Sequence, residues 1–270
     1  MQWLEPVSPP DQLENLPGRT LHRVNVLQEG VRNLNGDGIN MGIWDGGSVN
    51  TSHLDFSPAG RVTVERAGGV SDHATHVAGT MTGKGLVNPT AKGMAPNARL
   101  YNWDFNTDIQ VEMAVEIPAK NLLVSSHSYG FSFSGACALT NSLLSYESRS
   151  RGTDININNN PSHLHVHSAG NSGGSCTGGF HTITGSGKPA KNNIVVSNVT
   201  TTEAISGSSS RGPVRDGRIK PEISAMGTSV FSTWIPNNSY STISGTSMST
   251  PGVSGTAALL YQRYKQLNAN

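Results

Sequence analysis

The chain has 270 residues, of which 35% are apolar and 14% charged, and this composition suits one sizeable globular domain with an ample core. The formal net charge of +1 gives no electrostatic reason to expect nucleic acid or an anionic membrane as a partner. No apolar run reaches the length of a membrane span, and no signal peptide opens the sequence.

The N-terminal residues 1–19 contain four prolines among polar neighbours, which predicts an extended arm. The remaining residues, 20–270, are expected to form a single domain. At its start, the apolar residues between His22 and Leu34 fit one face of an amphipathic helix.

A short apolar run at 39–44 ends at Asp45, Gly46 and Gly47 and predicts a buried parallel strand. Proteins of the α/β class place functional groups in the loops that follow the carboxyl ends of such strands. An aspartate before two glycines is nevertheless most often a turn residue, so both roles stay open for Asp45.

The segment 71–80 predicts a helix that begins near His73 and carries His73 and His76 on one face. Such a pair could suit a metal ion. The glutamate of the zinc pattern His-Glu-x-x-His is missing, however, because position 74 is alanine. The sequence therefore disfavours a metal site here.

Strands are predicted at 97–102 and 121–130, with a helix at 109–119 between them, and this alternation is typical of a βαβ unit. A further helix is predicted at 138–150 and a further strand at 193–198. The pattern indicates an α/β fold.

The strand predicted at 163–171 carries His163, His165 and His167 at alternate positions, so the three side chains share one face. They could chelate a metal ion, or they could form a polar network packed under a helix or loop. No nearby cluster of carboxylates completes a ligand set, which favours the polar network.

The only cysteines are Cys137 and Cys176. A bridge between them would close a loop of about 40 residues and stabilise the fold by about 3–4 kcal/mol in the chain-entropy model. It would also argue for an oxidising compartment. Two separate buried thiols are equally compatible with the sequence.

Near the C-terminus, residues 245–251 read Gly-Thr-Ser-Met-Ser-Thr-Pro and lead into an apolar helix at 252–264. Proline is tolerated there, because the first turn of a helix needs no backbone donor. Ser247 thus lies where helix N–H groups converge. It is either a nucleophile or an ordinary helix cap.

Together these segments resemble the subtilisin-like serine proteases from about residue 20 to residue 264. The family's motifs occur in its own order, at 43–47, 73–80, 169–171, 209–213 and 245–251. Gly46 replaces the family's threonine or serine, and Ala74 replaces its glycine. The resemblance implies a three-layer α/β fold in which helices flank a central, mostly parallel sheet.

The resemblance further implies a serine endopeptidase that works through an acyl-enzyme. Its catalytic triad would be Asp45, His73 and Ser247, with Ser247 as nucleophile, His73 as base and Asp45 orienting the imidazole. Asn171 would stabilise the oxyanion. Residues 20–270 would then be the catalytic domain.

By the same resemblance, substrate lies extended along residues 128–130. The walls of the pocket for the substrate's P1 side chain would be Ser128, Tyr129, Gly130, Ser168, Ala169 and Gly170. These are mostly small residues, which favours broad specificity with an apolar P1 side chain. The residue that closes the pocket is expected within 173–180.

The resemblance implies no cofactor for the chemistry. Family members often carry structural calcium, although no Asp-rich loop here matches a calcium pattern. The expected partners are polypeptide substrates and the protein's own removed propeptide, and the expected state is a monomer. The protein would be secreted or extracytoplasmic in a bacterium, with signal peptide and propeptide absent from this chain.

Two other functions compete with this one. A subtilase fold could be catalytically silent and bind peptides, and a metal-dependent hydrolase could use the strand of His163, His165 and His167.

Overall fold

The computed structural model describes residues 16–268, and its centre is a seven-stranded sheet in the order β2-β3-β1-β4-β5-β6-β7. Every pairing in this sheet is parallel. The strands are β1 (Asn40–Asp45), β2 (Val62–Arg66), β3 (Arg99–Asp104), β4 (Val124–His127), β5 (Leu164–Ser168), β6 (Ile194–Val199) and β7 (Ile223–Met226). The order of the strands reverses between β1 and β4, and crevices at such switch points are where α/β sheets bind ligands.

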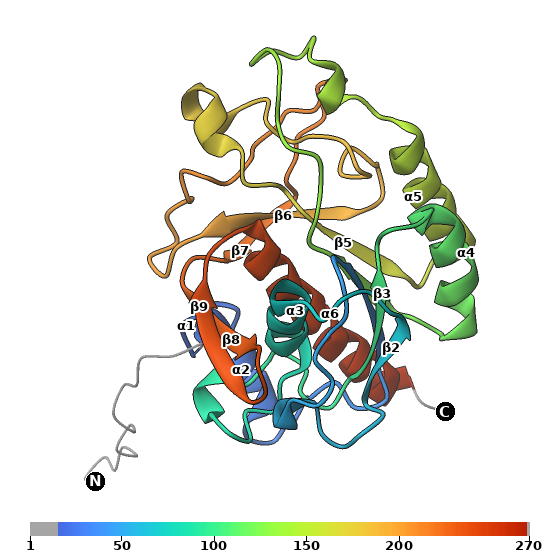
Figure 1. The fold of residues 1–270 in the computed structure, drawn as a ribbon, viewed down its shortest axis with the longest axis vertical. Coiled ribbons are helices and arrows are strands. Elements are labelled where there is room, and N and C mark those ends of the chain that lie inside the picture. Colours follow the sequence, from blue (N-terminus) through green and yellow to red (C-terminus); the bar gives the residue numbers. More distant parts are fainter. Residues whose placement is uncertain (1–15, 269–270) are drawn as a thin grey trace, which may run out of the picture.

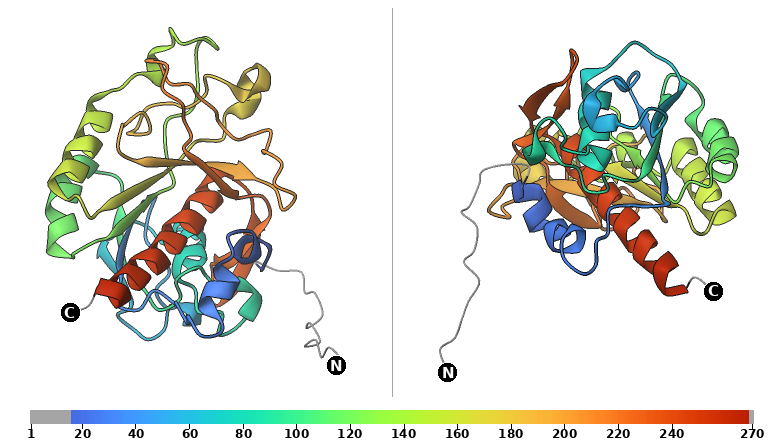
Figure 2. Two further views of the ribbon diagram at one scale, coloured as in Figure 1. Left: turned by 180° about the vertical axis from the view of Figure 1, so that it is seen from behind. Right: turned by 90° about the horizontal axis from the view of Figure 1, so that it is seen from below.

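Helices cover both faces of the sheet (Figures 1 and 2). Helices α3 (Asp72–Thr82) and α6 (Thr246–Asn268) pack on one face, and α4 (Ile109–Ala119) and α5 (Ser148–Asn159) lie on the other. Successive strand residues point to opposite faces, so Ile43 joins the larger apolar core under α3 and α6, and Trp44 joins the smaller one under α4. The three-layer α/β fold expected from the sequence is confirmed.

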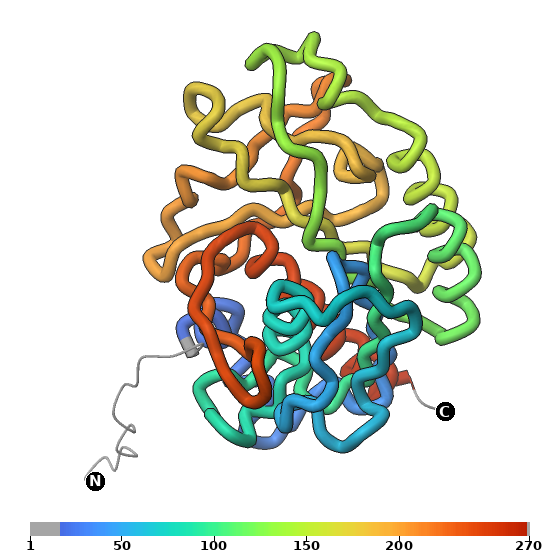
Figure 3. Tube along the Cα trace, viewed as in Figure 1, coloured from blue at the N-terminus to red at the C-terminus, as the bar shows by residue number. Residues whose placement is uncertain are grey.

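Smaller elements complete the chain, whose course can be followed in Figure 3. Helices α1 (Leu16–Leu21) and α2 (Val24–Gln28) precede β1, and an antiparallel hairpin of β8 (Val230–Trp234) and β9 (Ser239–Ile243) packs on α3. Single 3-10 turns are η1 (Leu54–Phe56), η2 (Pro89–Ala91), η3 (Ser142–Leu144), η4 (Gly173–Ser175) and η5 (Thr177–Gly179). Across residues 16–268, no helix is long and apolar enough to cross a membrane.

Most sequence-predicted elements are confirmed, and the helix at 109–119 has the bounds that were predicted. The single helix expected between His22 and Leu34 is wrong. Helix α2 ends at Gln28, because Glu29 is extended with ψ 162° and Gly30 has φ 69°. At the other end, Arg23 adopts a left-handed conformation with φ 56°, which separates α1 from α2. Residues 1–15 of the expected N-terminal arm lie outside the described residues, and residues 16–19 belong to α1.

The helix expected at 138–150 is also wrong. The side chain of Asn141 accepts a hydrogen bond from Leu143 N and caps the turn η3 instead. The carboxylate of Glu147 accepts bonds from the backbone N–H groups of Arg149 and Ser150, so it caps α5, which begins at Ser148. Local side-chain caps therefore outweigh the leucine spacing in this segment.

Candidate active site

The fold brings three sequence-predicted residues to one edge of the sheet. Asp45 is the last residue of β1, His73 lies in the first turn of α3, and Ser247 lies in the first turn of α6. Helix α3 contacts β1, and the first turn of α6 is hydrogen-bonded through Ser247 to Ser128, just after the neighbouring strand β4. Both helices therefore begin at the carboxyl-terminal edge of the parallel sheet.

Asp45 and His73 form a direct pair. The Nδ1 atom of His73 lies 2.7 Å from Oδ1 of Asp45, which also accepts a hydrogen bond of 2.8 Å from Gly46 N. The side chain of Asp45 is 2% exposed, whereas that of His73 is 35% exposed. A carboxylate can only accept, so the pair places the imidazole proton on Nδ1 and leaves Nε2 free to act as a base.

The second oxygen of Asp45 stays unused. Asp45 Oδ2 is buried and has no hydrogen-bond partner among residues 16–268. Gly46 follows the aspartate where the resembling family has threonine or serine, so no hydroxyl is available from that position. The orientation of Asp45 therefore rests on Oδ1 alone.

The surroundings of His73 keep it basic. Burial lowers its pKa, but the hydrogen bond and the charge of Asp45, together with the charge of Asp72, outweigh that effect and raise the pKa above its ordinary value of 6.5. His76, its neighbour on the helix, is fully buried and its Nε2 contacts Val230 O at 3.0 Å. Burial lowers the pKa of His76 to about 4, and its contact ties α3 to the hairpin.

Ser247 is half-buried, and its hydroxyl donates to Ser128 O at 3.2 Å. Within residues 16–268, no hydrogen bond joins Ser247 Oγ to His73 Nε2. Serine hydroxyls rotate freely, and catalytic hydrogen bonds often tighten only when substrate is bound. Ser128 Oγ in turn donates to Ser247 O at 3.1 Å, which fixes the backbone of the serine against the end of β4.

Asn171 is exposed at the end of β5, and its side chain is held by one atom. Its Oδ1 accepts hydrogen bonds from Thr246 N at 2.9 Å and from Thr246 Oγ1 at 3.1 Å. In the described part of the chain, its Nδ2 amino group donates to no acceptor. Asn171 thus presents an anchored, unused donor beside Ser247.

A pocket of about 380 Å³ opens next to these residues. Strands β4 and β5 are parallel neighbours, so the segments that leave them run side by side and form its two walls. Its lining comprises residues 129–133, Ser168, residues 170–172, Lys188, Thr246 and Ser247.

Four of the six predicted wall residues line this pocket: Tyr129, Gly130, Ser168 and Gly170. Ser128 instead contacts the backbone of Ser247. Ala169 is fully buried in a small apolar cluster with Ile183 and Val195.

The expectation that a residue within 173–180 closes the pocket is wrong, because none of these residues lines it and Lys188 does. Sequence reasoning missed Lys188, since a lysine between Gly187 and Pro189 is ordinarily a solvated loop residue.

The two cysteines form a disulfide, Cys137–Cys176, with Cα atoms 5.6 Å apart. The bridge ties the segment after β4 to the segment after β5. Both segments contribute to the walls of the pocket, so the bridge restrains the pocket's outer rim.

The histidine strand is β5, and the ring of His167 lies with its centroid 5.1 Å from that of the pocket residue Tyr129. His127 of β4 joins the same cluster of rings. The ring of His165 stacks on that of His127 with centroids 3.8 Å apart, and His127 stacks on Trp44. His163 Nδ1 contacts Leu122 O at 2.9 Å, and His167 Nε2 contacts Ser186 O at 3.1 Å.

These four imidazoles are buried and neutral. Burial lowers the pKa of His163 to about 4 and that of His167 to about 3, and it lowers those of His127 and His165 well below 6.5. Among residues 16–268, no group of three or more His, Cys, Asp or Glu side chains is arranged to hold a metal ion. The rings form a packed stack with peripheral hydrogen bonds, which agrees with the polar-network interpretation.

Comparisons with known proteins agree with this geometry. Subtilisin DY of Bacillus licheniformis is 31% identical over 257 residues, which are 91% of this chain and 83% of that protein. A thermostable alkaline protease of Halalkalibacterium halodurans is 30% identical, over 92% of this chain and 63% of that protein. This chain thus spans most of the first relative and less than two thirds of the second.

A solved structure, the CspB protease of Clostridium perfringens, has a similar fold. Its TM-score is 0.73 at 15% sequence identity, over 93% of this chain and 89% of that one. Residues 36–270 also match the sequence model of the subtilase family (peptidase S8). The chain therefore belongs to the subtilase family of serine peptidases.

Proposed function

We propose that the chain is a serine endopeptidase whose catalytic triad is Asp45, His73 and Ser247. The observation that carries the proposal is the buried Asp45 bound to a half-exposed His73, at the sheet edge where α6 presents Ser247 beside a pocket. Family membership and the bacterial subtilisin relatives support a peptidase.

Each residue has a distinct step in this mechanism. Ser247 Oγ attacks the peptide carbonyl carbon, and His73 Nε2 accepts the hydroxyl proton, because serine is a weak nucleophile until a base takes that proton. His73 then returns the proton to the leaving amine, which leaves an acyl-enzyme on Ser247. Water, activated by the same imidazole, hydrolyses the ester. Asp45 orients the ring and stabilises the imidazolium.

The oxyanion of the tetrahedral intermediate is stabilised by two donors in this proposal. One is Asn171 Nδ2, whose amide is anchored through Oδ1 to Thr246. The other is the backbone N–H of Ser247 in the first turn of α6, where helix donors are unpaired. An anchored donor needs no reorganisation when the charge develops, and this lowers the barrier.

Substrate binds as an extended strand along residues 128–130, with its P1 side chain in the 380 Å³ pocket. The expectation of broad specificity with an apolar P1 side chain rested on the small wall residues. Lys188 was not part of that reasoning, and it argues for a different preference, which is developed below.

The same proposal covers the enzyme's substrates, its need for a cofactor, its oligomeric state and its location. Its substrates are polypeptides, its chemistry needs no cofactor, and the mature form acts as a monomer outside the cytoplasm after loss of a propeptide. The disulfide supports an oxidising compartment. A structural calcium ion stays an expectation, carried by the resemblance alone.

Cleavage of casein, an unstructured protein, tests the proposed function. The wild type should degrade casein, and Ser247→Ala should not, while both show the same thermal unfolding. Casein cleavage that survives Ser247→Ala and stops with a chelator would move the chemistry to the histidine strand. Absence of cleavage by the wild type would favour a silent, peptide-binding subtilase fold.

A further inference from the structure

Lys188 places a cation inside the pocket. The residue is only 2% exposed, although it lies in a loop between β5 and β6. A Cβ atom added at Gly130 would come within 2.1 Å of Lys188 Nζ, and one at Gly170 within 3.3 Å. Gly130 follows β4 and Gly170 follows β5, so the ammonium lies between the two walls of the pocket.

This ammonium has no protein partner in the described residues: neither a hydrogen bond nor an ion pair is formed by Lys188 Nζ. Burial alone lowers the pKa of Lys188, to about 8, so the amine is still mostly protonated at pH 7. Burying an unpaired charge is costly, and such groups are ordinarily paired. No aspartate or glutamate lines the pocket.

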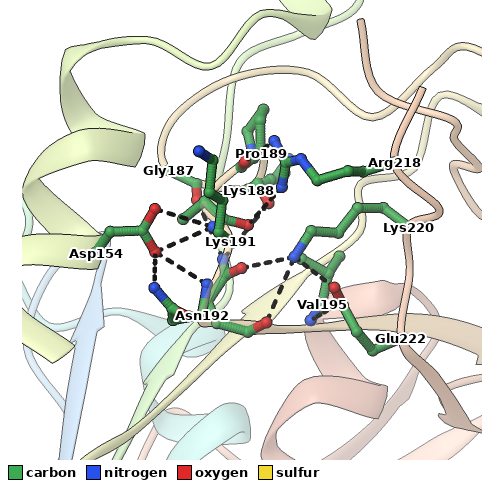
Figure 4. A network of polar contacts seen from close by, with 12 residues as sticks. Asp154, Gly187, Lys188, Pro189, Lys191, Asn192, Val195, Arg218, Lys220 and Glu222 are labelled. Carbon is green, nitrogen blue, oxygen red and sulfur yellow. Dashed lines mark hydrogen bonds and ion pairs between the residues drawn. The ribbon is translucent and has the colours of Figure 1, made fainter. Parts of the chain in front are cut away.

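The backbone that carries Lys188 is firmly held (Figure 4). Asp154 accepts hydrogen bonds from Lys191 N and Asn192 N, and Arg218 donates to Pro189 O at 2.7 Å. Asn193 Nδ2 donates to Gly187 O at 3.1 Å, on the residue before Lys188. The backbone is thus held on both sides of the lysine.

We propose that Lys188 determines specificity by binding the carboxylate of an acidic P1 side chain, glutamate or aspartate, at the base of the pocket beside Ser247. The inference rests on the proposed function. The substrate supplies the missing counter-ion, so the charge pair forms only when a peptide with an acidic P1 residue is bound.

Other P1 side chains fit this pocket less well. An apolar side chain would displace water from the ammonium without forming a hydrogen bond to it. The buried charge would then have neither water nor a counter-ion, which costs free energy. A lysine or arginine would meet a like charge. Glutamine has the shape of glutamate but lacks its charge, so the glutamate–glutamine pair isolates the role of Lys188.

The test uses peptide p-nitroanilides that are identical except for P1, namely glutamate, aspartate, glutamine, leucine and lysine. A hydrogen bond to a charged group predicts kcat/KM for glutamate roughly 10- to 100-fold above that for glutamine. Cleavage of both with a ratio near one, or leucine as the preferred P1 residue, would overturn the inference and leave the proposed function standing. If the protein cleaves none of the five peptides and does not cleave casein, both the inference on P1 specificity and the proposed function are wrong.

Two variants sharpen the test. Lys188→Met keeps an unbranched side chain one atom shorter and removes the charge, so it should abolish the glutamate preference and raise kcat/KM for leucine. Lys191→Met, on the exposed part of the same loop, should keep the wild-type ratio. Thermal unfolding checks that both variants fold. If Lys188→Met does not fold, the wild-type glutamate-to-glutamine ratio and the P1 residues in a casein digest still decide the question.

Discussion

Two regions of the molecule bury basic side chains in different ways. The first region is the active-site edge that holds His73 and Lys188, where the side-chain nitrogens face the space that substrate would occupy. No aspartate or glutamate lies near Lys188 there. Behind it lies the packed interior, defined by His127, His165 and Lys220. Its histidines are neutral, and Lys220 is bound by Asn193 and Glu222.

The difference indicates where function lies. A buried cation that its own protein neutralises, such as Lys220, serves the fold. A buried cation left unpaired beside a pocket, such as Lys188, serves a ligand, because the cost of its burial is offset only when an anion arrives. His73 is intermediate: Asp45 holds it, yet its second nitrogen stays available.

The largest expected effect concerns His73. Replacing the proposed base by alanine should lower kcat by roughly 10⁴-fold or more. His165→Leu, in the packed interior, should leave kcat within a few-fold of the wild type. The ring of His165 packs on other histidines and touches none of the atoms that react in the proposed mechanism. Steady-state kinetics on a peptide substrate measures both. Similar losses in the two variants would erase the distinction between the regions.

The second effect concerns the anchored donor. Asn171→Ala should lower kcat by roughly 10²- to 10³-fold while KM changes little, because the oxyanion forms only in the transition state. Asn171→Asp, which places a negative charge at the same position, is expected to do at least as much harm. A defect confined to KM would contradict the role of Asn171 in the oxyanion hole.

Stability separates the two buried lysines. Lys220→Met leaves Asn193 Oδ1 and Glu222 without their partner and should destabilise the fold by about 1–3 kcal/mol. Lys188→Met removes an unpaired buried charge and should be neutral or stabilising. Urea unfolding of the two variants gives the comparison. Equal destabilisation would mean that Lys188 also has a structural partner.

The smallest effect is on pH dependence. His73 must be neutral to act as a base, and its pKa is raised, so kcat/KM should rise with pH through a pKa above about 6.5. Asp72 contributes to that rise in pKa, so Asp72→Asn should shift the acid limb to lower pH by roughly a few tenths of a unit, less at high salt. An unchanged or upward shift would contradict this electrostatic account.

The resemblance to the family assigned the proposed triad, and the elements that carry it could be predicted from sequence because each of them is local. The strand that ends at Asp45, the helix that begins near His73 and the helix expected at 252–264 are each encoded by contiguous residues. The last of these begins earlier than expected, at Thr246, so Pro251 lies inside α6 and not in its first turn. The parallel fold then brings the three ends together.

The remaining features depend on contacts between distant segments. Lys188 is buried because the segments after β4 and β5 enclose it, and nothing adjacent to it in sequence signals this. His127 meets His165 only through the register of β4 on β5. The end of α1 near Arg23 depends on a left-handed residue that helical periodicity does not reveal.

The most direct test of the central claim is to label the protein with a fluorophosphonate and locate the adduct by mass spectrometry of a digest. The proposed triad predicts one adduct, on Ser247 in the peptide that includes Met248, and loss of labelling in His73→Ala. An adduct on another residue, or casein cleavage by a protein whose Ser247 stays unlabelled, would contradict the assignment of Ser247 as the nucleophile.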